Sequence, residues 1–587
     1  NFTTATDSYN TAVGYSAGLS VTTGIVNTLI GGLAGDSLTD ADNNVVVGYA
    51  ALATDTLGSR STAIGTAALR FQNFTTATDT YNVAVGFNAG NAVTTGIQNT
   101  LIGALAGDAL TDADFNTAVG LNALTSDTKG NYTTALGYSA LGIQNFTTST
   151  NTYSTAVGAF AGRQTTTATQ NTLIGGLAGT ALTTGDNNVV VGMNALSSDT
   201  LGDRAVAVGT EALANQNFTT TTDNYNVALG YHAGNDVTTG INNTLIGALA
   251  GDALTDADEN TALGRNSLGS DTLGSKTVAI GHGALFAQNF TTATDSYNVA
   301  VGYEAGVAVT TATNNTIVGG LAGDAIQTGS ANTAIGMSAL TTNTQGGKNV
   351  AVGFRALNTY NHNTSTDAYN TAVGYDAGLE ISTGTQNTAL GALAGDDITT
   401  GSSNLCLGYN SGFDLNTGSF NCYIGPLSTG ASSSSSAFEL VLATTNTSIT
   451  GKGNSTAFIA PGATGAAFQG NNSSTWSTTS DRRVKKNIED YTVGLEKINQ
   501  IRVRNFEYRT ADEITEVPSH AAIGKEGVQL GVIAQEIETV LPDVVKEEST
   551  GVKSVVTDTL TWYLVNSVQE LSAQVTALQA EVNTLKG

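Results

Sequence analysis

The side chains best suited to take part in a reaction lie in one short segment. It begins at Ser480 and runs through two arginines and two lysines to Ile488. A serine hydroxyl becomes a nucleophile when a neighbouring base takes its proton, and a lysine that burial keeps neutral can serve as that base. Residues five apart point to opposite sides of a strand and lie roughly 140° apart on a helix. Either the chain bends or the lysine comes from another copy of the chain, and local geometry does not choose between Lys485 and Lys486 as partner of Ser480. A basic surface segment with an ordinary serine stays open as the alternative.

Other reactive side chains give weaker signals. A pair of carboxylates that cleaves a glycan needs two acids about 5–10 Å apart, but the acids of this chain repeat with its turns and form no singular cluster. Acidic turns such as 38–43 and 110–114 carry oxygen ligands for calcium but lack the spacing of a calcium loop, so we expect solvated turns. The four histidines are scattered. We predict no metal site and no cofactor.

The two cysteines, Cys406 and Cys422, lie 16 residues apart in a repeat of 17 residues. They stand two and three positions before the glycine of their repeats, so strands in neighbouring repeats would point them to opposite faces. Two thiols are too few for a zinc site. We therefore expect two free thiols rather than a disulfide.

Most of the chain is an internal repeat. The motif Asn-Thr-Ala-Val-Gly at 10–14 recurs in related forms up to Asn421–Gly425, and its glycines at 14, 31, 48, 65 and 86 are spaced by 17, 17, 17 and 21 residues. The four steps make a super-repeat of 72 residues, and six super-repeats contain 24 coils. The four extra residues fall in Gln-Asn-Phe-Thr-Thr segments such as 72–76, which we expect to protrude.

Each repeat predicts one short strand, a tight corner and a return loop. The residue before the glycine is Val, Ile or Leu, the residue three before it is Thr or Val in nearly every coil, and a small Ala or a Leu usually stands between them. Coils stacked about 4.8 Å apart would form a rod of roughly 115 Å. This pattern resembles the heads of trimeric autotransporter adhesins and the repeats of phage tail fibres. We predict a β-solenoid or β-roll shaft over residues 1–425.

A single coil is narrow, and Ala and Thr make up much of its expected core. Such a coil buries little apolar surface alone, so lateral association is the expected source of further burial. We predict a homotrimer.

The density of charged residues and the net charge differ between the repeat region and the C-terminal part of the chain. Residues 1–479 carry 10 basic and 31 acidic residues, a net charge of −21, and residues 480–587 have a net charge of −5. A chain this acidic has no basic stripe to neutralise phosphates, so we expect no nucleic acid partner. No apolar run approaches the roughly 20 residues that span a bilayer, and no signal peptide is visible. Because the sequence starts inside a repeat and without Met, we expect an upstream virion or cell anchor that is missing from this chain.

Residues 480–587 carry several motifs in a fixed order. They follow Ser480–Ile488 as Gly494–Ile498, Phe506–Tyr508, Gly531–Glu536 and Leu541–Pro542. Together they resemble the C-terminal intramolecular chaperone, a self-cleaving serine endopeptidase domain found on endosialidases, phage tail fibres and neck appendages.

The resemblance implies a small α+β domain with Ser480 as nucleophile, Lys485 as base and one cleavage per molecule between Thr479 and Ser480. Gln535 and Glu536 are candidates for a supporting role near the site, and an ordinary helix surface explains them equally.

The chain closes with a helix that we expect to begin at about Thr557. Its apolar residues alternate in steps of four and three, which is the spacing of a coiled-coil seam. We expect the trimer to be held there by Leu564, Val568, Leu571, Val575, Leu578, Val582 and Leu585. Val at one core position with Leu at the other favours two strands, but three heptads are too short to set the stoichiometry against 24 coils.

Residues 426–479 differ from both neighbours and contain a serine run, two apolar stretches at 438–442 and 458–459, and Trp476. We predict a β-structured distal tip or adaptor. After cleavage this segment would end the mature fibre, so a receptor-binding tip and a seat for the chaperone are both open.

These observations predict a mainly β fibre: a trimeric solenoid shaft, a small tip and an α+β chaperone that ends in a coiled-coil helix. We expect a phage tail fibre, part of the virion tail, that attaches to a host surface receptor, either glycan or protein. A bacterial surface adhesin with the same shaft and maturation domain is the alternative, and a polysaccharide-degrading tailspike is a third.

Overall fold

The computed structural model describes residues 5–430, 435–444, 447–460, 467–469, 480–517, 523, 525–547 and 551–587. The chain divides into two compact units, Asn1–Thr478 and Thr479–Gly587. Each unit has its own hydrophobic core. We describe them separately as the shaft and the C-terminal domain.

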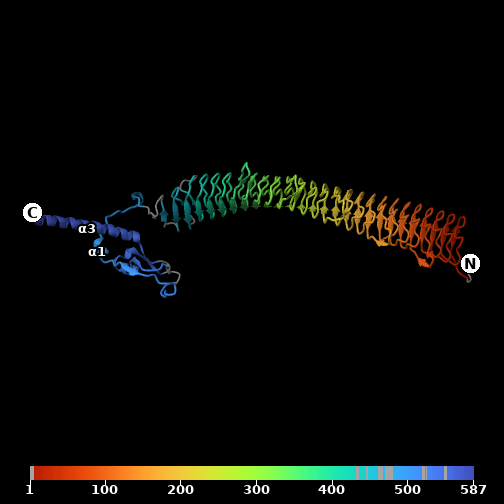
Figure 1. Cartoon of the computed structure of the whole chain (residues 1–587), viewed down its shortest axis with the longest axis horizontal. Coiled ribbons are helices and arrows are strands. Elements are labelled where there is room, and N and C mark those ends of the chain that lie inside the picture. The colour runs from red at the N-terminus through yellow and green to blue at the C-terminus, as the bar shows by residue number, and fades with distance from the viewer. Residues whose placement is uncertain are drawn as a thin grey trace. The chain divides into compact units, whose positions relative to one another are not determined.

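The shaft is a β-solenoid, which confirms the fold predicted from the repeat. Each coil contributes one short strand that pairs in parallel with the strands of the coils before and after it, and Figure 1 shows these strands stacked along the shaft. In the described residues these strands belong to one 27-stranded sheet. The coil strands are β1 (Thr11–Val13), β2 (Thr28–Ile30), β3 (Val45–Val47), β5 (Thr62–Ile64), β7 (Val83–Val85), β8 (Thr100–Ile102), β9 (Thr117–Val119), β11 (Thr134–Leu136), β13 (Thr155–Val157), β14 (Thr172–Ile174), β15 (Val189–Val191), β17 (Val206–Val208), β19 (Val227–Leu229), β20 (Thr244–Ile246), β21 (Thr261–Leu263), β23 (Val278–Ile280), β25 (Val299–Val301), β26 (Thr316–Val318), β27 (Thr333–Ile335), β29 (Val350–Val352), β31 (Thr371–Val373), β32 (Thr388–Leu390), β33 (Leu405–Leu407) and β34 (Cys422–Ile424).

The alternation of side chains along each strand sets what the coil buries. The middle residue points inward, as Leu173 does in β14, and packs in a core with a corner alanine and a loop leucine such as Ala178 and Leu182. The flanking threonine and isoleucine of β14 point outward. The core is therefore built of Ala and Leu rather than the Ala and Thr expected from composition, because threonine occupies an outward position of the strand.

The repeat glycine is required by the close stacking of coils. Gly175 follows β14 with φ +136°, and a Cβ atom there would lie 2.4 Å from the carbonyl oxygen of Gly192 in the next coil. No other residue type fits that approach or adopts that backbone conformation readily.

A column of buried asparagines fixes the register between coils. The Asn188 amide N–H donates to Asn171 Oδ1 at 2.8 Å, and Asn171 Nδ2 donates to the carbonyl of Gly185 at 2.7 Å. Asn188 repeats both contacts one coil further on, with Ala205 and Gly202. Each side chain thus satisfies one backbone donor and one backbone acceptor inside the shaft, which is what a buried loop requires.

The predicted shaft boundary at residue 425 is wrong by two coils. Strands β36 (Leu440–Ala443) and β38 (Ala457–Ala460) continue the parallel ladder from β34. Glycine spacing misses them because alanine stands where the repeat glycine would be in both coils. The ladder then ends on β39 (Ala467–Gln469), which pairs with β38 in the antiparallel direction. A short antiparallel strand covers the sheet edge that would otherwise be open to pairing.

The 21-residue coils add a second, short parallel pairing beside the main sheet. These two-residue strands are β4 (Gly58–Ser59) with β6 (Thr78–Asp79), β10 (Gly130–Asn131) with β12 (Thr150–Asn151), β16 (Gly202–Asp203) with β18 (Thr222–Asp223), β22 (Gly274–Ser275) with β24 (Thr294–Asp295), and β28 (Gly346–Gly347) with β30 (Thr366–Asp367). β35 (Ser428–Thr429) and β37 (Ile449–Thr450) pair in the same way after the last repeat.

The C-terminal domain is a small α+β unit. Two antiparallel pairs, β40 (Arg504–Phe506) with β41 (Gln529–Gly531) and β42 (Val545–Glu547) with β43 (Lys553–Val555), accompany helices α1 (Leu495–Ile498), α2 (Ala534–Val540) and α3 (Thr557–Lys586) and the 3₁₀ turns η1 (Arg482–Val484) and η3 (Pro542–Val544). Its buried core is Ile537, Leu541, Val544 and Tyr563. The closing helix begins at Thr557, as the sequence predicts.

Candidate functional site

The structure brings Ser480 and Lys485 together at the start of the C-terminal domain. Lys485 Nζ donates a hydrogen bond to Ser480 Oγ at 2.6 Å. A strand or a helix would keep these residues apart, but the chain makes one 3₁₀ turn, η1, between an extended Asp481 and an extended Lys485. The turn folds the lysine back onto the serine of the same chain.

The surroundings of this pair are open in the single chain. Ser480 and Lys485 are both exposed. Lys486, the rival base on sequence grounds, makes no contact with Ser480 in the part of the chain that the structure describes. Thr479, the residue before the predicted cleavage point, lies outside the described residues.

The candidates for a supporting role lie at the start of α2. Arg504 of β40 forms two hydrogen bonds with the Glu536 carboxylate, at 2.8 and 3.2 Å, and this side-chain contact lowers the pKa of Glu536. Gln535 lines a groove beside β43 with a volume of about 820 Å³. No contact among the described residues joins either side chain to Ser480 or Lys485, so their supporting role stays a prediction.

The predicted seam of α3 is uncovered in the single chain. All seven of its residues are exposed, from 42 % for Val582 to 82 % for Leu585. Only the first part of α3 packs on the domain, through Tyr563, whose hydroxyl donates to Asp543 at 2.8 Å, and through Glu570, which accepts from the backbone of Leu495 at 2.7 Å. Residues 571–587 are exposed throughout. A long apolar seam without a cover is suited to binding other helices.

A second uncovered surface runs along the shaft. We call it the outer sheet face, and it consists of the residues one and three positions before each repeat glycine. In every coil these positions hold Thr, Val, Ile, Leu or, once, Cys, and none is charged. Examples such as Ile174 and Leu263 are 39 % and 43 % exposed, and the residues directly after the glycine include exposed tyrosines such as Tyr231 and Tyr303.

The cysteines behave as two separate thiols. Both are free, with Cys406 buried in the core and Cys422 partly exposed in the neighbouring strand. Burial raises the pKa of the Cys406 thiol to about 12, so it remains protonated and unreactive near neutral pH.

The polar groups that sequence reasoning missed lie under the predicted protrusions. Asp127 is buried, and its carboxylate accepts from Gln144 Nε2 at 2.7 Å and from the backbone of Phe146 at 3.1 Å. Asp55, Asp199 and Asp271 make the same contacts with the glutamines 17 residues later. Each segment is thus anchored by its Gln and Phe, and only the residues after the Phe project. The 72-residue recurrence of an Asp with a Gln 17 residues later was the signal for this anchor.

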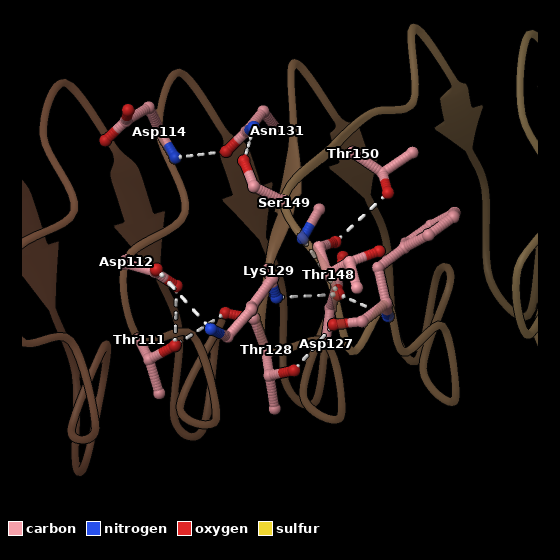
Figure 2. A network of polar contacts seen from close by, with 12 residues as sticks. Thr111, Asp112, Asp114, Asp127, Thr128, Lys129, Asn131, Thr148, Ser149 and Thr150 are labelled. Atoms are coloured by element: carbon pink, nitrogen blue, oxygen red, sulfur yellow. Dashed lines mark hydrogen bonds and ion pairs between the residues drawn. The ribbon is translucent and has the colours of Figure 1, made fainter.

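The remaining shaft acids are dispersed. Figure 2 shows the arrangement in one coil pair, where Lys129 pairs with Asp112 at 3.6 Å and the backbone of Asp114 donates to Asn131 at 2.8 Å. Across the described residues, no three His, Cys, Asp or Glu side chains form a group that could hold a metal ion. No helix in the described part of the chain is long and apolar enough to cross a membrane.

Comparison with known proteins gives one match. Residues 480–546 match the family model described as the chaperone of endosialidase, and that match begins at Ser480. No curated protein and no solved structure matches the chain. The family implies an autoproteolytic chaperone domain, and its position after a β-solenoid fits a phage tail fibre with a C-terminal chaperone.

Proposed function

We propose that this chain is a trimeric tail fibre protein of a phage, which attaches to the host surface and is matured by its own C-terminal domain. In this proposal the domain brings three chains together and is then released by cleavage between Thr479 and Ser480. The contact between Lys485 Nζ and Ser480 Oγ, at the residue where the family match begins, is the observation that carries the maturation step.

The chemistry follows from that contact. With the lysine neutral, Nζ takes the proton of Ser480 Oγ, and the oxygen attacks the carbonyl carbon of Thr479. The C–N bond to Ser480 then breaks, its nitrogen leaves as an amine with the proton returned, and an ester joins Thr479 to the serine oxygen. Water hydrolyses the ester, which leaves a Thr479 carboxylate and a free serine hydroxyl. Each molecule reacts once because the bond it cleaves is its own.

The single chain leaves the lysine exposed, whereas the reaction needs it neutral. We infer that assembly precedes cleavage, since packing among copies would remove water from a site that is open in one chain. This order suits a chaperone, which should leave only after the fibre has formed.

Lateral assembly of the shaft is supported by the outer sheet face. A strip over 24 coils, about 4.8 Å apart and about 7 Å wide, covers roughly 800 Å², which is the share of one partner in a standard protein interface. The strip is uncharged although residues 1–479 carry a net charge of −21. A monomer would expose this strip to water along its whole length, which soluble monomers rarely do. The exposed seam of α3 adds a second surface of the same kind in the same chain.

Cleavage is tested by following the full chain on a denaturing gel and sequencing the N-terminus of the small fragment. We expect that fragment to begin at Ser480. Ser480→Ala and Lys485→Ala should leave the chain intact, and Lys486→Ala should still cleave because Lys486 does not contact the hydroxyl. Processing of Ser480→Ala at the normal rate would refute the proposed nucleophile.

Host attachment is tested separately, by adsorption to cells of the processed fibre with its whole 426–479 region and of a variant shortened within that region. The predicted tip residue Trp476 lies outside the described residues, and strands β36 and β38 of this region belong to the shaft ladder. We expect loss of adsorption with the trimer retained when residues 470–478 alone are removed, because this deletion keeps β39 and the bond between Thr479 and Ser480. Unchanged adsorption would move the receptor site onto the shaft.

A further inference from the structure

The turn that joins Ser480 to Lys485 has little to stabilise it except one side chain. Its three residues are all exposed, and short 3₁₀ turns in water are marginal without support. Two backbone bonds close it, from Val484 to the carbonyl of Asp481 at 3.1 Å and from Lys485 to the carbonyl of Arg482 at 3.2 Å. The backbone N–H of Arg483 would have no partner within the turn itself.

Asp481 supplies that partner. It stands directly before the turn in an extended conformation, and its Oδ1 accepts from the Arg483 backbone at 2.8 Å. This is the geometry of an N-cap, which is among the strongest local signals for starting a helical turn. The cap fixes where the turn begins, and therefore where Lys485 emerges relative to Ser480.

The same carboxylate also holds the Arg483 side chain. The guanidinium donates from Nη2 to Oδ2 at 2.6 Å and from Nε to both oxygens at 3.1 Å. This contact, with the backbone bond, lowers the pKa of Asp481, so the carboxylate stays ionised into acid conditions. Because the charges of Asp481 and Arg483 lie so close together, their electrostatic effects on Lys485 largely cancel. The Asp481 carboxylate therefore does little to stabilise the charged form of Lys485.

We propose that Asp481 is a positioning residue of the self-cleavage site, where its carboxylate caps the turn that brings Lys485 to Ser480 and is neutralised by Arg483. The inference rests on the proposed cleavage. An unpaired carboxylate beside the dyad would favour the protonated lysine and oppose its work as a base, so the pairing serves the reaction as well as the fold.

The charges around Lys485 come from its own segment. Asp481 and Arg483 form the ion pair, and Arg482 and Lys486 add positive charge on either side. In the described residues no ion pair joins Lys485 to an acid of another element. Variants of the ion pair should therefore move the pH at which cleavage is half-maximal, in directions set by the charge left behind.

The experiment refolds the denatured full-length precursor into buffers from pH 6 to 10 and measures the rate of cleavage on gels. Asp481→Ala removes the cap, and we expect the plateau rate to fall by about 5- to 30-fold, the factor that corresponds to a lost cap. Asp481→Asn keeps the oxygen acceptor, so its plateau should remain within about twofold of wild type. Asp490→Ala, an exposed acid nine residues further on, is the matched control and should behave as wild type.

The pH midpoint separates a charge role from a purely structural one. Asp481→Asn leaves Arg483 unpaired, and the midpoint should fall by about 0.4 pH unit for a charge roughly 8 Å away in water. Arg483→Gln leaves the carboxylate unpaired and should raise the midpoint by a similar amount. Light scattering of each refolded precursor checks that assembly is unchanged.

Equal cleavage rates in wild type and Asp481→Ala, or midpoints that do not move in opposite directions, would overturn the positioning role while leaving the proposed cleavage intact. A wild-type chain that does not cleave before Ser480 would instead overturn the proposed function.

Discussion

The shaft and the C-terminal domain bury their apolar residues in different ways. The shaft carries one continuous core from Leu29 to Ala460, to which most coils add a few Ala and Leu residues. In the described residues the buried core of the C-terminal domain has four residues, and more than half of its longest helix is exposed. The shaft therefore buries a continuous core but leaves the apolar residues of its outer sheet face exposed. The C-terminal domain leaves the apolar seam of α3 exposed.

This difference suits the two units to different steps of assembly. A repeat in which each coil contacts only its neighbours can start to stack anywhere, and its open edges are prone to faulty pairing during slow assembly. A short coiled coil assembles from local contacts and is not exposed to that error. A chain that joins the two can use the helix to align three copies before the outer sheet faces meet.

The largest expected effect is on the seam of α3. Val575→Asp should place a charge in the core of the coiled coil, and most of the chain should then appear in the insoluble fraction rather than as soluble fibre. Gln574→Asp, one residue away and outside the seam, is the control. The measurement is the soluble yield together with sedimentation velocity. Soluble, processed fibre from Val575→Asp at the wild-type yield would show that the seam does not direct assembly.

The next effect concerns the outer sheet face. Ile174→Lys combined with Leu263→Lys should prevent lateral association of the shaft, because buried lysines in a symmetric interface would have no partners. Lysine is chosen because it reduces the negative charge of the shaft, so general repulsion between chains cannot explain a loss. Thr184→Lys, on an exposed return loop of the same coil as Ile174, should leave the association unchanged. Sedimentation of the double variant as the wild-type assembly would show that another face is used.

A smaller, local effect is expected inside the shaft. Asn188→Ala leaves the carbonyl of Gly202 and the amide of Ala205 buried without partners, at a cost of about 2–4 kcal/mol. Because coils contact only their neighbours, the loss should be confined to adjacent coils. Hydrogen exchange of β15 and β17 should rise while that of distant strands stays at the wild-type rate. Thr184→Ala is the control and should exchange as wild type does. If Asn188→Ala also exchanged at the wild-type rate in β15 and β17, the buried asparagines would not stabilise the stacking of the coils.

The smallest effect is on pH dependence. Burial raises the pKa of several shaft carboxyls, including Asp36, Asp199, Asp252 and Asp324, and burial together with the nearby Asp397 raises that of Asp396 from 3.8 to about 6. Between pH 3.8 and about pH 6, the folded shaft therefore binds more protons than the unfolded chain. This contribution to stability is complete below about pH 4 and is lost as the pH rises through 6.

We expect the melting temperature of the processed shaft to fall by a few degrees from pH 4.5 to pH 7. Asp396→Asn should reduce that fall because it removes the most strongly shifted group. A melting temperature that rises over this interval would show that other groups dominate.

The sequence allowed most of the shaft to be predicted and less of the C-terminal domain. Strand positions and the two free cysteines follow from a pattern that repeats 24 times, whereas the outward position of threonine did not follow from composition. The last two coils were missed because alanine replaces their glycine, and the anchored inserts were missed because the bond between Asp127 and Gln144 joins residues one coil apart.

The contact between Ser480 and Lys485 could be predicted only in part from the sequence. The residue types around Ser480 allowed two lysines, and the choice of Lys485 came from a family resemblance. What the sequence alone could not supply is the 3₁₀ turn, because its start depends on one capping contact of Asp481 rather than on a periodic pattern.

In the proposed fibre, two further copies of the chain cover the uncharged outer sheet face of the shaft. The most direct test is the molar mass of the processed shaft in dilute solution, measured by light scattering after the C-terminal domain has been released. We expect three times the mass of residues 1–479, unchanged on further dilution. A stable, soluble shaft with the mass of one chain would contradict it.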